Sequence, residues 1–467
     1  MVDRALFSFV LLFGSILPRT AWSQIAFTHV NVINVRNGTL APNRTVLIVG
    51  SRIDAVMPAA QDRLPPHTVV IDAKGKFLIP GLWDMHVDAL WDTTRAKVFF
   101  PLFLANGVTG VREMGGPMPV ADQVGWRNQV FSGEILGPRL VVSGPFVDGP
   151  HPIWPGSMKV STEADGERAV ELLKAAGADF VKVYTGVPRP AYFGIAREAH
   201  KDHIPFVGHL PVWIGVDEAS NAGQKSIEHL MGIVLYTSSK SAELTADLMK
   251  GINSNQLNNQ MVDTYDPARA AKLFALFVEN DTWQVPTLTI RHARPYLKEL
   301  QAANDPRLKY MAKDITDAWG PKVDARQPAD PAVIASRKRL FEKELELVGA
   351  MQHAGVQLLA GTDTPNPFSF PGFSLHDELG FMVQAGLTPL EALQSATIKP
   401  AEFLGLSETL GTVEKGKIAD LVLLDANPLE NIANTKSIRA VISNGRLFDR
   451  AALDHMLSGV ASSMAGK

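Results

Sequence analysis

The sequence predicts an α/β fold in which one elaborated barrel of repeated βα units lies between two β-rich chain ends that pair with one another. Residues 80 to 408 alternate short apolar strands with segments of helical periodicity, which is typical of a parallel sheet. Residues 24 to 79 and 409 to 467 carry short β-branched runs separated by turn sequences, followed by a C-terminal tail. At 467 residues the chain is long enough for both parts.

The composition excludes several classes of protein. The 45 basic and 48 acidic side chains leave a net charge of −3, which provides no electrostatic basis for binding nucleic acid or an anionic membrane. Hydrophobic residues at 46% and charged residues at 20% are typical of a globular chain and exclude disorder. Cysteine is absent, so a bound metal would have nitrogen and oxygen ligands.

The first 23 residues are predicted to be an export signal. Arg4 precedes an apolar run over residues 5 to 17, and Ala21 and Ser23 form a small-x-small cleavage site before Gln24. The run is too short to span a bilayer, which needs roughly 20 apolar residues. We therefore expect a periplasmic or secreted protein without a membrane span after cleavage; an uncleaved anchor or a buried helix is the alternative.

The two chain ends share one sequence pattern, in which short strand-like runs are separated by turns. Residues 25 to 35 and 46 to 53 read as strands, broken by turns at Asn37-Gly38 and at Pro65-Pro66. Residues 419 to 424 and 438 to 443 read as further strands, with a turn at Asn444-Gly445. Neither half can bury a sheet face alone, so we expect them to form one split β domain.

Capping residues mark the helices of the central barrel. Thr162 is predicted to cap a helix that runs to about residue 176, before a strand at 179 to 184. Thr388 and Glu391 form a capping box with a proline in the first turn. The charged, helical stretch from about 291 to 350 is longer than a barrel unit requires and is a candidate lid over the mouth.

Polar residues follow the apolar strands of this barrel. His86 and Asp88 stand two apart on the first strand and therefore point to the same side. Lys182 lies in an apolar strand, where an unpaired ammonium group is costly. Because the carboxyl ends of the strands converge in a barrel, these residues are expected to meet the polar residues at three further strand ends: His209, His229 and Asp363.

These segments resemble the metal-dependent amidohydrolase superfamily, in particular its prolidase-like and imidazolonepropionase-like branch. The resemblance covers nearly the whole chain after residue 23. It is carried by Pro-Gly-x-x-Asp-x-His at 80 to 86 and by short motifs at 107–112, 181–184, 208–209, 227–229, 361–363 and 416–422. Each motif is weak alone, but the ordered set is specific.

The resemblance implies a (β/α)8 TIM barrel with a small β-sandwich domain built from both chain ends. It further implies hydrolysis of amide or peptide bonds at a centre of two divalent ions, zinc or manganese, with Lys182 carboxylated and bridging the ions. Asp363 would be the proton shuttle for a metal-bound hydroxide. The implied ligands are His86, Asp88, Lys182, His209, His229 and Asp363.

One position departs from the family pattern. The branch normally has His-x-His on the first strand, whereas here the second residue is Asp88. The additional negative charge should make the centre a weaker Lewis acid and raise the pKa of its water. A carboxylate also favours harder ions such as Mn²⁺.

The residues also have structural interpretations. His86 and Asp88 could be a satisfied polar pair, Lys182 a buried ion-pair partner, and the two later histidines core residues. Tyr184 is a candidate substrate contact or a residue packed against the lid. His151 and His376 fall in predicted loops at the mouth and are weaker substrate-contact candidates.

Two functions remain open on the sequence. The first is a hydrolase of small-molecule or short-peptide amides; the second is a metal-depleted barrel that binds a small ligand without turnover. No Gly-x-Ser-x-Gly motif supports serine-hydrolase chemistry. The sequence encodes neither the substrate nor the oligomeric state, and leaves a homo-oligomer open.

Overall fold

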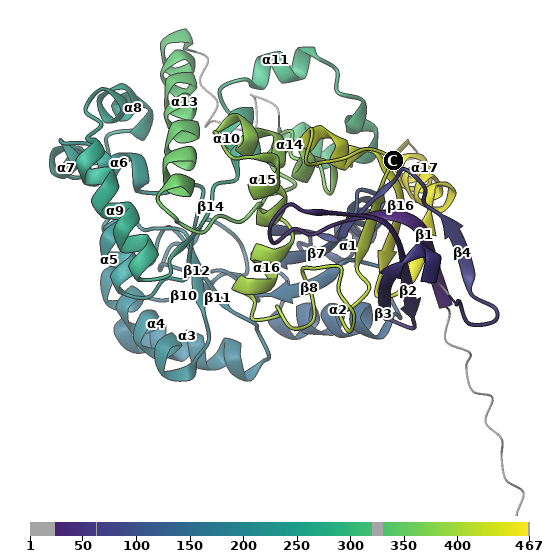
Figure 1. Ribbon diagram of the computed structural model, residues 1–467. Coiled ribbons are helices and arrows are strands. Elements are labelled where there is room, and N and C mark those ends of the chain that lie inside the picture. The colour runs from purple at the N-terminus through teal and green to yellow at the C-terminus, as the bar shows by residue number, and fades with distance from the viewer. Residues whose placement is uncertain (1–23, 62, 320–329, 466–467) are drawn as a thin grey trace, which may run out of the picture.

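The computed structural model describes residues 24–61, 63–319 and 330–465, so the predicted signal segment lies outside the described residues. A barrel surrounded by helices lies beside a curled sheet, and in this sheet the first strands of the chain (purple) meet the last ones (yellow) (Figure 1). The predicted α/β class is confirmed.

Both chain ends contribute to one eight-stranded sheet, in the order β17-β16-β15-β5-β1-β2-β3, with β4 paired to β1. The ends join where β15 runs antiparallel to β5, with Leu421 opposite Pro80. Phe27, Ile48 and Leu78 lie in its separate apolar core. The predicted pairing across the whole chain is confirmed. The strands are β1 (Gln24–Ile33), β2 (Leu40–Val49), β3 (Arg52–Pro58), β4 (Val69–Asp72), β5 (Phe77–Pro80), β15 (Leu421–Leu424), β16 (Ile438–Ser443) and β17 (Arg446–Asp449).

The barrel is built from parallel strands in two sheets. The first is β6 (Leu82–Val87), β7 (Val108–Glu113) and β8 (Arg139–Val142). The second contains β9 (Val147–Asp148), β10 (Met158–Lys159), β11 (Val181–Val183), β12 (Phe206–Gly208), β13 (Ser226–Glu228) and β14 (Trp283–Val285).

Residues 357–364 close the barrel between these sheets. Leu358 bridges Gln284 of β14 and Thr364 bridges Val87 of β6, both in parallel register. On the opposite side, the amide of Asp179 donates to Val142 at the end of β8. The predicted (β/α)8 architecture is therefore confirmed, and its polar strand ends lie at one mouth.

Helices cover the outside of the barrel, and their start signals follow the sequence. Thr162 and Asp165 form a capping box at α3, and Thr388 and Glu391 form the predicted one at α15. These helices are α1 (Thr93–Ala105), α2 (Val120–Ser132), α3 (Glu163–Ala175), α4 (Arg189–Asp202), α5 (Val216–Asn221), α9 (Pro267–Glu279), α14 (Phe373–Gln384), α15 (Pro389–Ser395) and α16 (Ile398–Phe403).

A second group of helices lies beyond the strand ends (Figure 1). It contains α6 (Ile233–Thr237), α7 (Ser241–Met249), α8 (Ser254–Asp263), α10 (Leu288–Ala293), α11 (Leu297–Ala302), α12 (Lys313–Ala318) and α13 (Pro331–His353). The described part of the segment predicted as a lid is thus helical, and Asn258 of α8 contacts Ser336 of α13. Its role as a lid stays a prediction.

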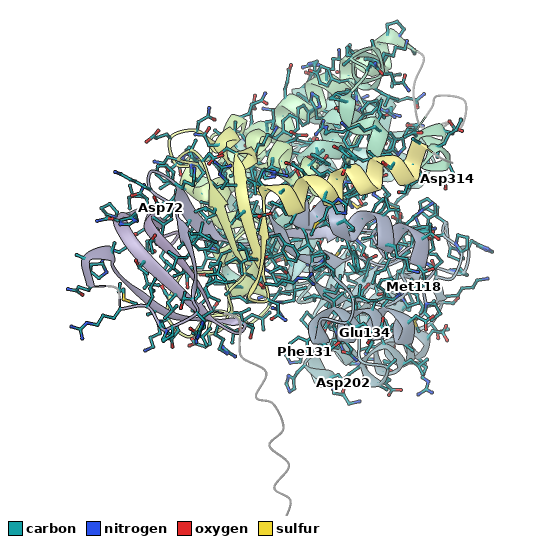
Figure 2. All side chains as sticks on the ribbon, turned by 90° about the vertical axis from the view of Figure 1, so that its right-hand side faces the viewer. Asp72, Met118, Phe131, Glu134, Asp202 and Asp314 are labelled. Atoms are coloured by element: carbon teal, nitrogen blue, oxygen red, sulfur yellow. The ribbon has the colours of Figure 1, made fainter. Side chains whose placement is uncertain are left out.

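The last helix, α17 (Arg450–Ala465), runs from the end sheet along α1 (Figure 2, yellow). Short 3-10 helices occur at Ala59–Gln61, Pro306–Tyr310 and Ile432–Lys436. Over the described ranges, no helix combines the length and apolar character that crossing a membrane requires.

Candidate metal centre

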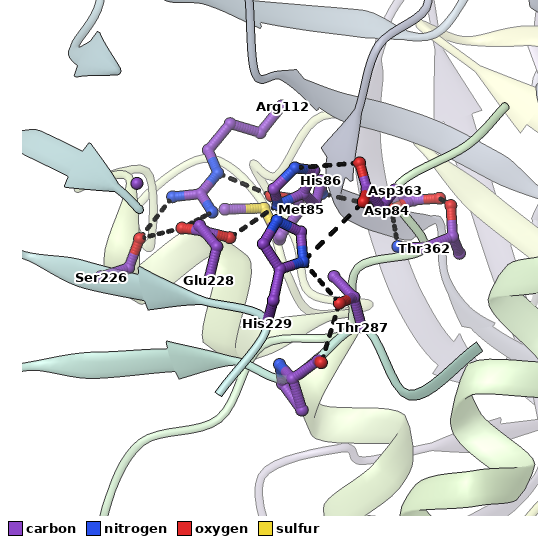
Figure 3. Close-up of polar contacts among 12 residues, drawn as sticks. Asp84, Met85, His86, Arg112, Ser226, Glu228, His229, Thr287, Thr362 and Asp363 are labelled. Atoms are coloured by element: carbon purple, nitrogen blue, oxygen red, sulfur yellow. Dashed lines mark hydrogen bonds and ion pairs between the residues drawn. The ribbon is translucent and has the colours of Figure 1, made fainter. Parts of the chain in front are cut away.

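His86, at the C-terminal end of β6, has both ring nitrogens facing carboxylates (Figure 3). Nδ1 lies 2.8 Å from Oε2 of Glu228, and Nε2 lies 3.3 Å from Oδ1 of Asp363. Burial and Lys182 lower the pKa of His86, but the two carboxylates outweigh them and the pKa is raised. A cation between Nε2 and Asp363 would take the place of that ring proton.

Glu228 is held in turn by Arg112 and Ser226. Arg112 donates from Nη2 to Oε1 of Glu228 at 2.9 Å, and Ser226 donates to the same oxygen at 2.6 Å. Burial alone would raise the pKa of Glu228, but Arg112 and His86 lower it to about 2. The ionised carboxylate therefore fixes the hydrogen of His86 on Nδ1 and directs Nε2 toward a metal.

His229 follows β13 with a left-handed backbone, at φ 61°, and Leu230 repeats this conformation at φ 55°. Such strain in residues other than glycine is typical of functional sites. The hydroxyl of Thr287 donates to the carbonyl of Pro286 at 2.8 Å and lies 2.8 Å from Nδ1 of His229. Because this hydroxyl hydrogen is already used, Nδ1–H of His229 donates to Thr287, and Nε2 keeps its lone pair.

His209 follows β12 and stands beside His229, with ring centroids 4.9 Å apart. Thr185 contacts its Nδ1 at 2.9 Å, and Tyr184 stacks on the ring at 4.2 Å. The preceding Gly208 has φ +127°, and a Cβ there would lie 2.4 Å from the carbonyl oxygen of Val183. Burial first, and then Lys182, lowers the pKa of His209 and keeps the ring neutral.

Lys182 is buried and Asp88 is partly buried, and neither Lys182 Nζ nor Asp88 Oδ1, both inaccessible to solvent, has a hydrogen-bond partner among the described residues. Burial lowers the pKa of Lys182 to about 8, although Glu228, Asp88 and Asp363 oppose the shift. Burial and Asp363 raise the pKa of Asp88 to about 7. Buried polar atoms without partners are costly, so these two atoms indicate a group that would complete the site.

The donor set fits divalent cations. Ligand atoms of His86, His229 and Asp363 all lie within 4.8 Å of one another. Imidazole nitrogen and carboxylate oxygen are ligands that zinc and manganese accept. Lys182 Nζ and Asp88 Oδ1, which have no hydrogen-bond partner among the described residues, could supply further ligand atoms. The residues present therefore fit the divalent metal that the fold implies.

Comparisons with known proteins agree with this geometry. Residues 297–448 match the amidohydrolase family. Imidazolonepropionase of Pseudomonas savastanoi pv. phaseolicola is 22% identical over 431 residues, which cover 87% of this chain and 93% of the relative. Two solved structures share the fold: a putative prolidase from Bifidobacterium longum (23% identity, TM-score 0.69, covering 94% of this chain and 99% of that one) and bottromycin amidohydrolase (24%, TM-score 0.75, 94% and 90%). Together these matches support the amidohydrolase superfamily for this chain.

The imidazolonepropionase and prolidase relatives are hydrolases that act on carbon–nitrogen bonds, and the matches support this branch and this enzyme class for the chain. The predicted family and enzyme class are therefore confirmed. The family is generally metal-dependent, in agreement with the His-His-Asp group.

The candidate site gathers the predicted ligands. Lys182 lies close enough for its charge to act on His86, His209 and His229, and Asp88 and Asp363 act on one another. The assignment of each residue as a ligand stays a prediction. Tyr184 lies against His209 and accepts a hydrogen bond at 2.8 Å from Trp154.

The two weaker histidine candidates differ from one another. His151 lies exposed in the loop between β9 and β10, as predicted. The predicted loop position of His376 is wrong, because this residue lies inside α14. Its ring is buried, with Nδ1 2.9 Å from the hydroxyl of Thr435 and Nε2 3.1 Å from the carbonyl of Asn106. These contacts occupy both nitrogens and join α14 to the end of α1 and to the C-terminal part of the chain.

Sequence reasoning missed Arg112, Glu228 and Thr287 as parts of the site. A signal existed for the first two: Arg112 lies in a buried apolar strand, and Glu228 directly precedes a predicted ligand, so each needed a partner of opposite charge. Thr287 had no signal, because its contact with His229 depends on the path of the chain after β14.

A cavity of about 970 Å³ opens beside His229. Thr185 and Asn366 line it near the strand ends, and residues of α6, α7, α8, α10 and α13 form the rest of its wall. The described part of the candidate lid therefore shares one cavity with the candidate metal centre.

Proposed function

We propose that this chain is an exported, metal-dependent hydrolase of amide or peptide bonds in small molecules or short peptides. The observation that carries the proposal is the convergence of His86, His229 and Asp363 within 4.8 Å, beside the orphaned atoms of Lys182 and Asp88. A xaa-Pro dipeptidase and a putative prolidase share the fold, and both names denote hydrolysis of this bond type.

The residues of this site have different roles: some would hold the metal ions, and others orient the side chains that do so. Two divalent ions, zinc or manganese, would be held by His86, Asp88, Lys182, His209, His229 and Asp363, with Lys182 carboxylated; when bound, they would polarise the amide carbonyl and make water nucleophilic at neutral pH. Thr287 and Glu228 orient the rings of His229 and His86. The cavity beside His229 admits the substrate.

Asp363 is the group that moves the proton in this proposal. Its side chain is 10% exposed, against 3% for His86, and it lies beside both His86 and His229. One carboxylate oxygen would take the proton from the attacking water and pass it to the leaving amine nitrogen, so that a neutral amine departs.

Metal content and hydrolysis should be measured together. N-acyl amino acids and dipeptides, including X-Pro, serve as substrates for protein loaded with zinc or manganese. Chelation and the substitutions His209→Ala and His229→Ala should each lower hydrolysis by at least about 100-fold and reduce bound metal, because each histidine supplies nitrogen to the centre. His200→Ala, at an exposed position on α4, is the control. Full activity in protein shown by elemental analysis to be metal-free would contradict the mechanism, and binding without turnover would favour the metal-depleted alternative.

Export is tested separately. Protein purified from the envelope or medium of the native host should begin at Gln24 when its N-terminus is sequenced. Intact Met1 on protein from the cytoplasm would overturn this part of the proposal.

A further inference from the structure

Glu378 lies in α14, on the outside of the barrel, and its side chain is fully buried. Oε1 accepts from the amide of Leu288 at 2.9 Å, and Oε2 accepts from the amide and the hydroxyl of Thr289 at 2.7 and 2.9 Å. Leu288 and Thr289 are the first two residues of α10. One carboxyl group on α14 therefore holds the start of α10.

The position of this carboxyl group is costly for the fold. Glu378 forms no ion pair with any described residue, and burial raises its pKa to about 8, although the bonds from Leu288 and Thr289 lower it. A buried carboxyl group needs hydrogen bonds to offset its lost hydration, and the donors of α10 supply them. A polar side chain at the start of α10 itself would provide a less costly cap.

Thr287 is the residue that would be expected to provide this cap. It occupies the N-cap position of α10, where a threonine normally turns its hydroxyl toward the amides of the first helical turn. Here the hydroxyl makes no such bond; it donates to the carbonyl of Pro286 and lies 2.8 Å from Nδ1 of His229 (Figure 3). Because Glu378 accepts from the amides of α10, the hydroxyl of Thr287 is left for the ring of His229.

The backbone of Thr287 has the same dependence on Glu378. It is left-handed, at φ 48°, a conformation that a β-branched residue rarely adopts and that persists only where the surroundings impose it. In the extended conformation that is usual for an N-cap residue, the hydroxyl could turn toward α10 instead. Glu378 holds the two amides that directly follow Thr287, so it is placed to impose the left-handed conformation.

The alternative partner for the ring of His229 is Asp363. Its Oδ2 lies 3.8 Å from Nδ1 of His229, farther than the hydroxyl of Thr287 at 2.8 Å. If that hydroxyl turned toward α10, the ring hydrogen would either face Asp363 or move to Nε2. The first change would engage the proposed proton shuttle, and the second would remove the lone pair that can bind a metal.

We propose that Glu378 is a positioning residue of the candidate metal centre, which caps α10 in place of Thr287 and thereby keeps the Thr287 hydroxyl on Nδ1 of His229. The inference rests on the proposed function, because His229 is a ligand of the metal centre proposed there. Glu378 itself lies behind α10 and acts through Thr287 alone.

The tautomer of His229 tests this proposal in the apoprotein, so that no metal is needed. In protein whose histidines carry isotopic nitrogen, the NMR signals of His229 are those that are missing from His229→Ala. The wild type should carry the ring hydrogen on Nδ1. Glu378→Gln should show a second tautomer with the hydrogen on Nε2, because a side-chain amide can accept at only one of its ends. The wild-type tautomer alone in Glu378→Gln would overturn the proposal.

A second variant keeps the test available if Glu378→Gln does not fold. Glu378→Asp retains the charge but is shorter by one methylene, so it can no longer accept from both amides of α10. It should show the same second tautomer of His229. A wild-type spectrum of His229 in this variant would count against the proposal equally.

Glu391→Gln is the matched control. Glu391 accepts from the amide and from the hydroxyl of Thr388, each at 2.8 Å, at the start of α15, which carries no candidate ligand. Both Glu378→Gln and Glu391→Gln should lower the free energy of unfolding in urea, because each weakens the cap of a helix. Only Glu378→Gln should change the signals of His229. Equal loss of stability with no change at His229 in either variant would make Glu378 a helix cap alone.

Metal affinity shows whether Glu378 acts through Thr287. Thr287→Val removes the hydroxyl and should weaken zinc binding about 10- to 100-fold, as is typical for a residue that orients a metal-binding histidine. Glu378→Gln should weaken zinc binding in the wild type and cause no further loss in Thr287→Val, because the contact through which it acts is already absent. Additive losses would overturn the route through Thr287.

The two readouts separate this inference from the proposed hydrolysis. A change of tautomer in Glu378→Gln, in a protein that binds no metal, would support the positioning role and refute the hydrolase. Metal-dependent hydrolysis by a protein whose His229 keeps one tautomer in all of these variants would do the reverse.

Discussion

Glu228 lies between a buried arginine and the ring of His86: Oε1 accepts from Arg112 at 2.9 Å, and Oε2 stands 2.8 Å from Nδ1 of His86. The three side chains come from β13, β7 and β6, so one carboxylate connects three strands of the barrel. This contact sets the tautomer of a candidate ligand, since only one ring nitrogen can face a metal.

Glu228→Gln should weaken metal binding about 10- to 100-fold, because the neutral amide removes the charge that increases the basicity of His86. Metal-buffer titrations measure this affinity directly. The apoprotein should also lose stability in urea unfolding, because Arg112 would keep its buried charge without a charged partner. Glu279→Gln, at an exposed position near the end of α9, is the control. Unchanged metal affinity in Glu228→Gln would mean that the contact between Glu228 and His86 stabilises the barrel and does not contribute to metal binding.

Assembly of the centre should depend on CO₂ and on pH. Carboxylation requires the neutral amine of Lys182, and its pKa of about 8 means that this form falls about tenfold for each pH unit below 8. At a fixed concentration of dissolved CO₂, the rate of metal uptake by apoprotein should therefore rise with pH and level off above about 8. Lys182→Ala should abolish the dependence on CO₂. Equal uptake rates with and without CO₂ in the wild type would exclude the carbamate.

Asp88→His should move the acidic limb of the pH–rate profile to lower pH. The substitution removes one negative charge from the centre, so that water there ionises more readily. Metal content, measured in parallel, shows whether the substituted site still binds two ions. If both the limb and the metal content stay unchanged, Asp88 is not a ligand, and the first strand contributes only His86.

His376 should make stability depend on pH between about 4 and 6.5. Burial lowers the pKa of the folded residue to about 4, whereas the unfolded residue takes up its proton near 6.5. The unfolded state therefore binds more protons within this window, and stability falls as pH falls. The full shift corresponds to about 3 kcal/mol.

The control for this effect is the variant His376→Gln, whose free energy of unfolding is compared with that of the wild type. Urea unfolding of the wild type and of His376→Gln, across this pH range, isolates the residue from the other histidines, because a glutamine amide can still donate to the carbonyl of Asn106. The free-energy difference should favour the wild type less as pH falls toward 4. Parallel curves would show that His376 does not titrate differently in the two states.

The sequence by itself determined the architecture and most of the polar positions. Strand and helix periodicities alternate over residues 80 to 408, and a parallel barrel places the carboxyl ends of its strands together, so His86, Lys182 and His209 could be assigned to one mouth. The pairing of the chain ends was also predictable, because neither group of strands could bury its apolar face alone.

The tertiary structure alone decided which groups orient these residues and where His376 lies. Glu228 and Arg112 are 116 residues apart, and His229 and Thr287 are 58 apart. Hydrogen bonds of this kind depend on strand register and on left-handed backbone at positions such as His229, which local propensity does not encode. His376 lies in α14, and its ring contacts Thr435 and the carbonyl of Asn106. The contact with Thr435 exists only once the C-terminal part of the chain has docked on the barrel.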